Sequence, residues 1–255
     1  MVLNYKVLGQ GQPLIILHGF LGSLDNWQGI AKELSDEYQV YIIDLRNHGK
    51  SEHHSKHSYA EMSEDLQQFF QEHKISKAHV LGHSMGGKIA MFFACENEKL
   101  VDKLVVVDIG PKYYPQHHQS VLNALNAVDL EKVSSRQEVE KQLMDQLNDM
   151  GVVQWLMKNL KRESGESFTW KFNLKDLTKE IENIGEALPE KAEFSNSALF
   201  LRGGNSNYVL EEDIDLMLEK FPLMKMETMK GAGHWVHAEQ PQEFVNVVRK
   251  FLKNN

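Results

Sequence analysis

The sequence predicts an α/β fold in which a mostly parallel sheet is covered by helices on both faces. Short apolar, β-branched runs alternate along the chain with longer stretches whose apolar residues recur at helical spacing. This alternation is typical of strand and helix units that build parallel sheets. The chain has 255 residues, enough for one large domain with a substantial core. Because the alternation is interrupted once, we expect a single domain with one insertion.

The expected core elements can be placed from these runs. The strands are expected at residues 14–17, 39–43, 78–81, 103–107, 198–201 and 225–228, preceded by residues 4–7, which alternate like a first strand. The helices are expected at residues 24–34, 59–72, 85–96, 211–221 and 242–252.

Strand signals disappear between Pro111 and Phe194, where several helix-like pieces follow one another. We therefore predict a core of residues 1–110 and 195–255, with residues 111–194 inserted between two core strands as a helical cap. The pieces cover residues 123–128, 139–147 and 152–160, and a turn at Gly165 leads to residues 168–174. Such a cap over the strand ends would build and close a substrate pocket, although simple covering of the sheet explains most of the pattern equally well.

Composition argues against several classes of protein. The net charge of −8 comes from dispersed acidic residues, and no run of Lys and Arg is present to follow phosphates, so we expect no nucleic acid partner. The apolar runs are far shorter than the ~20 residues of a membrane-spanning helix, so we expect no membrane insertion. The sequence starts without the features of a secretion signal, which favours the cytoplasm. Cys95 is the only cysteine, so no internal disulfide is expected, and we give it no catalytic role.

The strongest chemical motif is Gly82-His83-Ser84-Met85-Gly86, which follows an apolar strand-like run and precedes a helix-forming run. The two glycines permit a strained turn that projects the Ser84 hydroxyl from the end of the strand. The following helix directs its positive N-terminus at the same oxygen. A lone G-x-S-x-G pattern is common by chance, but this strand-to-helix context predicts Ser84 as a nucleophile.

A serine nucleophile needs a general base, and His234 is the histidine best placed to supply one. It lies in the Gly-flanked segment Gly231-Ala232-Gly233-His234-Trp235, between the last strand and the last helix. His237 is the rival, but it falls at the start of the next element, and His83 is expected to pack beside Ser84. Six further histidines lack metal-site spacing, so we expect no metal and interpret them as surface or pocket-rim residues: His48, His53, His54, His57, His117 and His118.

Taken together, these motifs resemble the α/β hydrolases over the full length of the chain, and within them the small YbfF-like esterases. The matching segments are His18-Gly19-Phe20-Leu21-Gly22-Ser23, Asp44-Leu45-Arg46-Asn47-His48-Gly49, residues 82–88, Val107-Asp108-Ile109, Gly203-Gly204-Asn205-Ser206 and residues 231–239. The resemblance implies hydrolysis of esters and thioesters, including acyl-CoA.

In this fold the loop after the first buried strand supplies half of the oxyanion hole. The resemblance therefore suggests the backbone N–H groups of Phe20 and Met85 as the two donors to the tetrahedral oxyanion. His18 is expected to brace the Phe20 loop by hydrogen bonding. Asp44 and Arg46 are expected to fix a turn together, and Asp44 is a weak candidate for catalysis.

The acid that orients the histidine is harder to place. Relatives usually carry it after the strand at residues 198–201, where this chain has Ser206 instead. Asp108 ends the neighbouring strand, and adjacent strands are only about 4.8 Å apart, so its carboxylate is within reach of the same imidazole. We predict Asp108 as the acid. Its alternative role is a turn aspartate before Gly110-Pro111, and Asp176 in the cap is a weaker candidate.

These assignments predict a Ser-His-Asp triad that works through an acyl-enzyme on a small acyl ester or thioester without a cofactor. The candidate pocket residues are Leu21, His83, Trp155, Met157, Ser206, Tyr208 and Trp235, beside Phe20 and Met85. Ordinary core packing explains Trp155 and Met157 equally well. The net negative charge would repel a CoA leaving group unless basic residues lined its route, the candidates being Lys88, Lys112, Lys158, Lys161 and Arg162.

Several alternatives stay open. Epoxide hydrolases and haloalkane dehalogenases share the fold but use an aspartate nucleophile, so Ser84 argues against them. Carbon–carbon bond hydrolases and perhydrolase-like members keep serine and remain alternatives. A non-catalytic ligand-binding homologue is a further one, against which Ser84 and His234 weigh. The oligomeric state is left undetermined by the sequence.

Overall fold

The computed structural model, which describes residues 1–116, 118–163 and 167–253, has a seven-stranded sheet at its centre, in the order β1-β3-β2-β4-β5-β8-β9. All pairings are parallel except that of β1 with β3. The strands are β1 (Tyr5–Leu8), β2 (Gln12–Leu17), β3 (Tyr38–Ile43), β4 (Ala78–His83), β5 (Val101–Val107), β8 (Ala198–Gly203) and β9 (Met224–Met229). The predicted fold class is confirmed, and each expected strand is present within a few residues of its predicted bounds.

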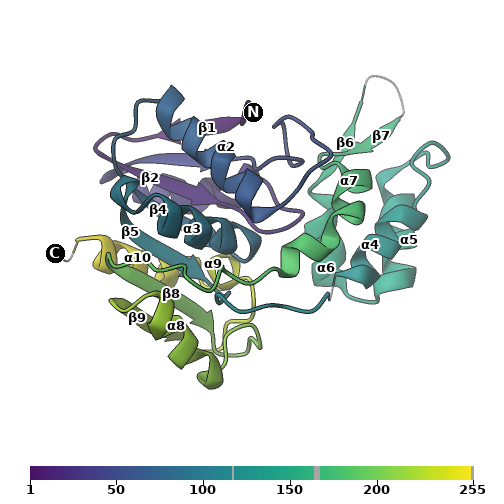
Figure 1. Cartoon of the computed structure of the whole chain (residues 1–255). Coiled ribbons are helices and arrows are strands. Elements are labelled where there is room, and N and C mark those ends of the chain that lie inside the picture. The colour runs from purple at the N-terminus through teal and green to yellow at the C-terminus, as the bar shows by residue number, and fades with distance from the viewer. Residues whose placement is uncertain (117, 164–166, 254–255) are drawn as a thin grey trace.

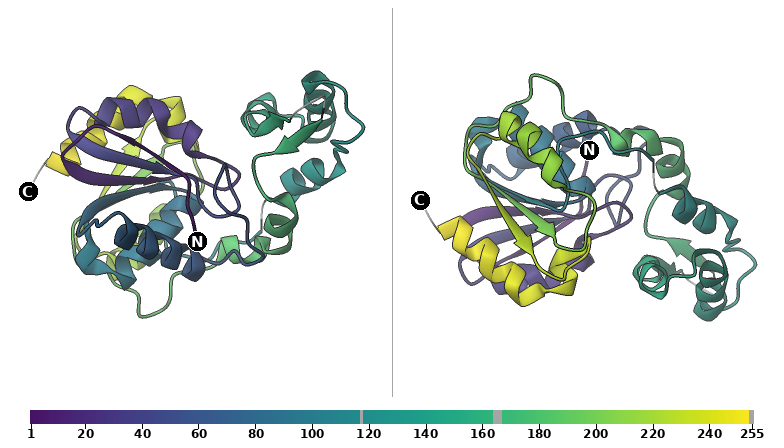
Figure 2. Two further views of the ribbon diagram at one scale, coloured as in Figure 1. Left: turned by 90° about the horizontal axis from the view of Figure 1, so that it is seen from above. Right: turned by 90° about the horizontal axis from the view of Figure 1, so that it is seen from below.

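Helices cover both faces of this sheet (Figures 1 and 2). Their bounds are α1 (Gln28–Leu34), α2 (Tyr59–Glu72), α3 (Met85–Glu96), α8 (Ile214–Lys220), α9 (Val236–Glu239) and α10 (Pro241–Lys253), with 3-10 turns at Leu24–Trp27, Glu98–Leu100 and Glu211–Asp213. Successive strand side chains point to opposite faces. Ile15 and Leu17 therefore join α2 and α3 in one buried cluster, whereas Leu14 and Ile16 join α1 and α10 in another.

Between β5 and β8 the chain forms the cap, which lies beyond the carboxyl ends of the parallel strands (Figure 1). It contains α4 (Gln119–Ala127), α5 (Arg136–Leu147), α6 (Met150–Met157), β6 (Leu160–Arg162), β7 (Phe168–Trp170), α7 (Leu174–Lys179) and a 3-10 turn at Ile181–Gly185. The expectation that this segment lacks strands is wrong, because β6 and β7 pair as an antiparallel hairpin. Strands of three residues are too short to show a period of two. The turn expected at Gly165 lies outside the described residues.

The chain enters the cap along residues 111–114 and leaves it along residues 185–188. These two connectors run beside each other, and one lysine of the core bonds to both. The Tyr114 amide donates to the Gly185 carbonyl (2.8 Å) and the Leu188 amide to the Pro111 carbonyl (2.9 Å). Lys88 of α3 donates through Nζ to the carbonyls of Lys112 (2.5 Å) and Glu186 (2.7 Å), one on each connector. Its side chain is fully buried, so Lys88 is a structural link rather than part of a route for substrate.

The described residues include no helix that is both long enough and apolar enough to cross a lipid bilayer.

Candidate active site

Ser84 occupies a sharp turn between β4, which ends at His83, and α3, which begins at Met85. Its φ of 52° lies in the left-handed region, which is strained for a serine. The chain approaches itself so closely here that a Cβ on Gly82 would lie 2.1 Å from the Gly86 carbonyl oxygen. The Ser84 amide donates to the Val107 carbonyl of β5 (3.0 Å), which fixes the turn against the neighbouring strand. The local geometry is that of the predicted nucleophile turn.

Asp108 directly follows β5, and its side chain meets His234. The distance from His234 Nδ1 to Asp108 Oδ2 is 2.7 Å. The other carboxylate oxygen, Oδ1, accepts from the Gly203 amide at 2.9 Å, and Ser206 Oγ donates to Oδ2. The Asp108 side chain is wholly buried. A carboxylate at Nδ1 favours the tautomer in which Nδ1 carries the proton and leaves Nε2 free to accept one.

Aromatic groups hold the His234 ring in place. Tyr208 stacks on it with ring centroids 3.8 Å apart and an interplanar angle of 15°. Burial and the Asp108 carboxylate raise the pKa of Tyr208 to about 12, so its phenol stays neutral. His83 Nε2 donates to the His234 carbonyl at 2.8 Å, in keeping with its expected place beside Ser84.

The rival His237 occupies a different environment. It is buried and stacks on Trp27 with centroids 4.1 Å apart. Burial, followed by the influence of His234, lowers the pKa of His237 to about 3. Asp108 contacts His234 and not His237, so of these two rivals His234 is the one with a carboxylate partner.

A cavity of about 840 Å³ opens over these groups. Ser84 and His234 line it together with five of the expected pocket residues, namely Phe20, His83, Trp155, Tyr208 and Trp235. The expectation is wrong for four others, Leu21, Met85, Met157 and Ser206, which do not line it. Leu21, Met85 and Met157 are buried in one hydrophobic cluster, and the Ser206 hydroxyl is bonded to Asp108.

Several lining residues were missed from the sequence. They include Asp25 and Trp27 from the turn before α1, Val121 from α4, Val152 from α6 and Glu239 from α9. The apolar periodicity of α4 and α6 signals that each helix has a buried face, but not that part of this face borders a cavity rather than core.

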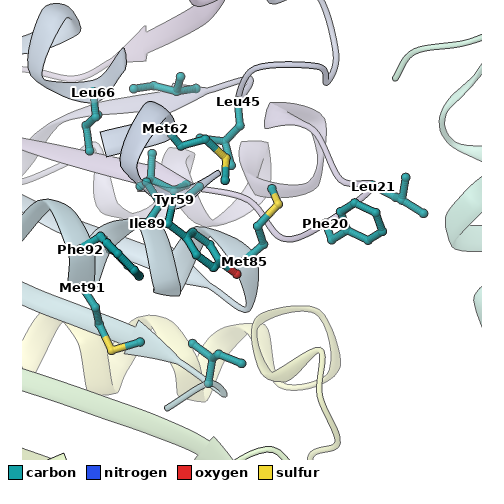
Figure 3. Packing of buried hydrophobic residues seen from close by; sticks show 14 of the residues in the cluster. Phe20, Leu21, Leu45, Tyr59, Met62, Leu66, Met85, Ile89, Met91 and Phe92 are labelled. Atoms are coloured by element: carbon teal, nitrogen blue, oxygen red, sulfur yellow. The ribbon is translucent and has the colours of Figure 1, made fainter. Parts of the chain in front are cut away.

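The loop that follows β2 runs beside the nucleophile. A Cβ on Gly19 would lie 3.4 Å from Ser84 Cβ, so the loop passes close to Ser84 at the residue before Phe20. Met85 supplies the first amide of α3, at the positive end of that helix. Its side chain packs in the buried cluster behind the loop, where Figure 3 shows it between Tyr59 and Phe20. The two predicted oxyanion donors therefore come from segments that adjoin Ser84.

His18 braces this loop as expected, since its Nε2 accepts from the Leu45 amide (3.0 Å) and its Nδ1 bonds the Gly19 carbonyl (2.8 Å). His48 and His57, which were expected at the surface or rim, are instead fully buried. His53 and His54 are exposed, and His118 lines the cavity. His117 lies outside the described residues.

Two further expectations concerned acidic residues. Asp44 and Arg46 do not pair. Arg46 forms a bidentate ion pair with Asp65 (2.6 and 2.8 Å), whereas the Asp44 carboxylate accepts from the backbone amides of Leu24 and Lys50. Asp176 bonds the side chain of Asn173 at the start of α7 and does not line the cavity. Among the described residues, no group of three or more His, Cys, Asp or Glu side chains is arranged to hold a metal ion.

The sheet order, the strained serine turn and the histidine–aspartate pair define a class of protein. A family model described as the alpha/beta hydrolase fold matches residues 12–136. Relatives more than 30% identical extend that match over nearly the whole chain. The chain belongs to the α/β-hydrolase family.

Individual relatives are more specific. A putative esterase/lipase of Haemophilus influenzae is 39% identical over 243 residues, which cover 95% of this chain and 83% of the relative. Esterase YbfF of Escherichia coli is 36% identical over 245 residues, 95% of this chain and 93% of YbfF. The mouse (Mus musculus) sn-1-specific diacylglycerol lipase ABHD11 is 36% identical and covers 98% of this chain and 85% of its own. A solved marine microorganism esterase superposes with a TM-score of 0.95 at 40% identity, covering 98% of each chain. The resemblance to the YbfF-like esterases is confirmed.

Proposed function

We propose that this protein is a serine esterase that hydrolyses carboxylic esters through Ser84, His234 and Asp108. Esterase or lipase names among the relatives support hydrolase activity. The observation that carries the proposal is the 2.7 Å contact between His234 Nδ1 and Asp108 Oδ2, behind a cavity that Ser84 and His234 both line. The partner is a small-molecule ester.

The reaction begins when the Ser84 hydroxyl attacks the ester carbonyl and His234 Nε2 takes its proton. The Asp108 carboxylate stabilises the imidazolium that results. His234 then returns the proton to the leaving alkoxide as the C–O bond breaks, which leaves an acyl group on Ser84. Water attacks this acyl-enzyme with His234 again as base, and the acid leaves as Ser84 regains its proton. Every proton is supplied by the chain, the substrate or water, and no cofactor takes part.

The negative charge that develops on the carbonyl oxygen requires donors that are already in place. The amides of Phe20 and Met85 are proposed for this role, and such donors are commonly worth about 3 kcal/mol each in the transition state. Neighbouring packing supports the proposal, because Gly19 lies against Ser84 and Met85 follows Ser84 directly.

The lining of the cavity favours an apolar acyl or alcohol group. Phe20, Trp155, Tyr208 and Trp235 contribute aromatic surface, and Val121 adds aliphatic surface. A cavity of this size accommodates a ligand of several hundred daltons. The cap would therefore select substrates by shape and apolar contact.

Acyl thioesters would follow the same steps. Of the five basic residues considered along a route for CoA, Lys158 is the one that lines the cavity, and it shares that lining with Asp25 and Glu239. This mixed charge offers a polyanionic leaving group little attraction. We therefore propose esters as the main substrates. A cytoplasmic location and a cap that spans residues 111–194 are further proposals.

The test is covalent labelling with a fluorophosphonate probe, with Ser84→Ala as the control. Labelling of the native protein and not of the variant supports the proposal. A native protein that neither labels nor turns over short and long acyl esters would favour a non-catalytic ligand-binding role. A panel that contains esters, acyl-CoA thioesters and carbon–carbon bond substrates separates the enzymatic alternatives by their relative kcat/KM.

A further inference from the structure

Leu21, next to the proposed oxyanion donor Phe20, has an unusual backbone conformation. Its φ is 56°, in the region that favours glycine. It is the third residue of a tight turn, closed by a hydrogen bond from the Gly22 amide to the Gly19 carbonyl (3.0 Å). A residue with a side chain is strained in this conformation, which persists only where its surroundings hold it. The turn that presents Phe20 therefore requires support from elsewhere.

Part of that support comes from the core. The Leu21 amide donates to His48 Nε2 at 3.1 Å, and His48 Nδ1 donates in turn to the Arg46 carbonyl at 2.8 Å. Burial, together with the neighbouring His18 and His57, lowers the pKa of His48 well below its usual value. His48 therefore stays neutral and keeps Nε2 as an acceptor.

The other part comes from the cap. Asn159 Nδ2 donates to the Leu21 carbonyl at 2.8 Å, in a buried contact that joins residues 138 positions apart. The backbone of Asn159 is itself held in place. Its backbone N–H donates to the Leu156 carbonyl (2.9 Å), and its backbone carbonyl accepts from the Lys171 amide (2.8 Å). It thus stands where α6 ends and the β6–β7 hairpin begins. Leu21 is therefore hydrogen-bonded through its amide to His48 of the core and through its carbonyl to Asn159 of the cap.

We propose that Asn159 is a positioning residue for the reaction, which holds the Phe20 amide in place through the carbonyl of Leu21. This inference rests on the proposed function. The contact between Asn159 of the cap and Leu21 then completes the oxyanion hole. The cap, which helps to shape the substrate cavity, therefore also influences the rate of the chemical step. Only a cap docked with Asn159 against Leu21 supports full turnover.

Asn159→Leu tests this directly, since leucine has the same branched shape and lacks the donor. Asn159→Ala is the second variant, in case the leucine packs poorly. The control is Tyr59→Phe, which deletes another buried donor between core and cap, from the Tyr59 hydroxyl to the Ile184 carbonyl (2.6 Å), away from the cavity. For each variant kcat, KM and thermal unfolding are measured, with the affinity for a trifluoromethyl ketone whose adduct carries the oxyanion.

We expect kcat to fall about ten- to a hundredfold in both Asn159 variants, with KM nearly unchanged. The affinity for the ketone should fall in parallel with kcat/KM, because the adduct needs the same donors. Tyr59→Phe should lower thermal stability to a similar extent and leave kcat near native. A purely structural role for Asn159 would instead give lost stability with native kcat, and that result would overturn the inference. Failure of the native protein to turn over any ester would overturn the proposed function itself.

Discussion

The buried amine of Lys88 leads to a prediction about stability that depends on pH. Burial is the main cause that lowers its pKa from 10.5 to about 7, which Glu186 opposes and Lys112 reinforces. Lys88→Met keeps most of the apolar length of the side chain and removes both the titrating group and the two hydrogen bonds to the cap connectors.

The size of the expected change in unfolding free energy follows from the difference in proton binding between the native and unfolded states. Between pH 7 and 10.5 the unfolded chain holds a proton on Lys88 that the native state has released. Stability therefore rises with pH in this window, by at most about 1.4 kcal/mol per pH unit for one group. The neutral amine still donates to both carbonyls. From about pH 7.5 to 9.5 the native protein should gain about 2 kcal/mol of unfolding free energy that Lys88→Met does not gain.

The assay is urea denaturation of the native protein and the variant at those two pH values. Lys88→Gln serves as a partner variant, because it is uncharged but retains a donor, so it should share the flatter pH dependence and lose less stability at each pH. The difference in unfolding free energy between native protein and Lys88→Met should widen at the higher pH. A difference that stays constant would refute the assignment of a low pKa to this amine.

Three further predictions concern the proposed active site and can be checked by hydrolysis of p-nitrophenyl esters. Asp108→Asn should lower kcat by about four orders of magnitude with the fold intact, since an amide at this position favours the wrong imidazole tautomer; near-native turnover would remove Asp108 from the triad. Ser206→Ala should cost less than about tenfold, because Asp108 keeps its bonds to His234 and Gly203, and a loss as large as that of Asp108→Asn would contradict this. Trp155→Ala should raise KM for aromatic or long acyl esters about tenfold with little change in kcat, whereas an unchanged KM would place the substrate elsewhere.

The core of the fold was predictable because its signals are local. The helix at residues 59–72 was placed at its observed bounds from apolar spacing, and it carries a capping box formed by Ser58 and Glu61. The strands read as apolar runs because both faces of a parallel sheet are buried. The β6–β7 hairpin was not predicted, because strands of three residues are too short to show an apolar pattern. They are stabilised by pairing with each other and by the rest of the cap.

In the candidate site, too, the residues with local sequence signals were predicted and those placed by tertiary contacts were not. Ser84 and His234 lie in segments whose glycines show the required turns, and Asp108 follows from the order of adjacent strands. His48 was misinterpreted, because nothing local distinguishes a rim histidine from one buried against the Leu21 amide. Asn159 gave no signal at all, since its partner Leu21 lies in a loop 138 positions away in the chain. Contacts that depend on how the cap docks are set by tertiary packing, which a single sequence does not display.

Strained backbone is concentrated where the proposed chemistry takes place. Leu21, Ser84 and Asp108 are three of the six non-glycine residues with positive φ in the described chain. Each is held by a hydrogen bond from its own amide, to His48, to Val107 of β5 and to Leu201 of β8 respectively. Two of these acceptors are sheet carbonyls, so the positions of the proposed nucleophile and acid derive from the rigid sheet rather than from flexible loops. Leu21 is bonded to a side-chain acceptor and to Asn159 of the cap, which makes the loop of Phe20 and Leu21 the part of the proposed site most open to adjustment by the cap.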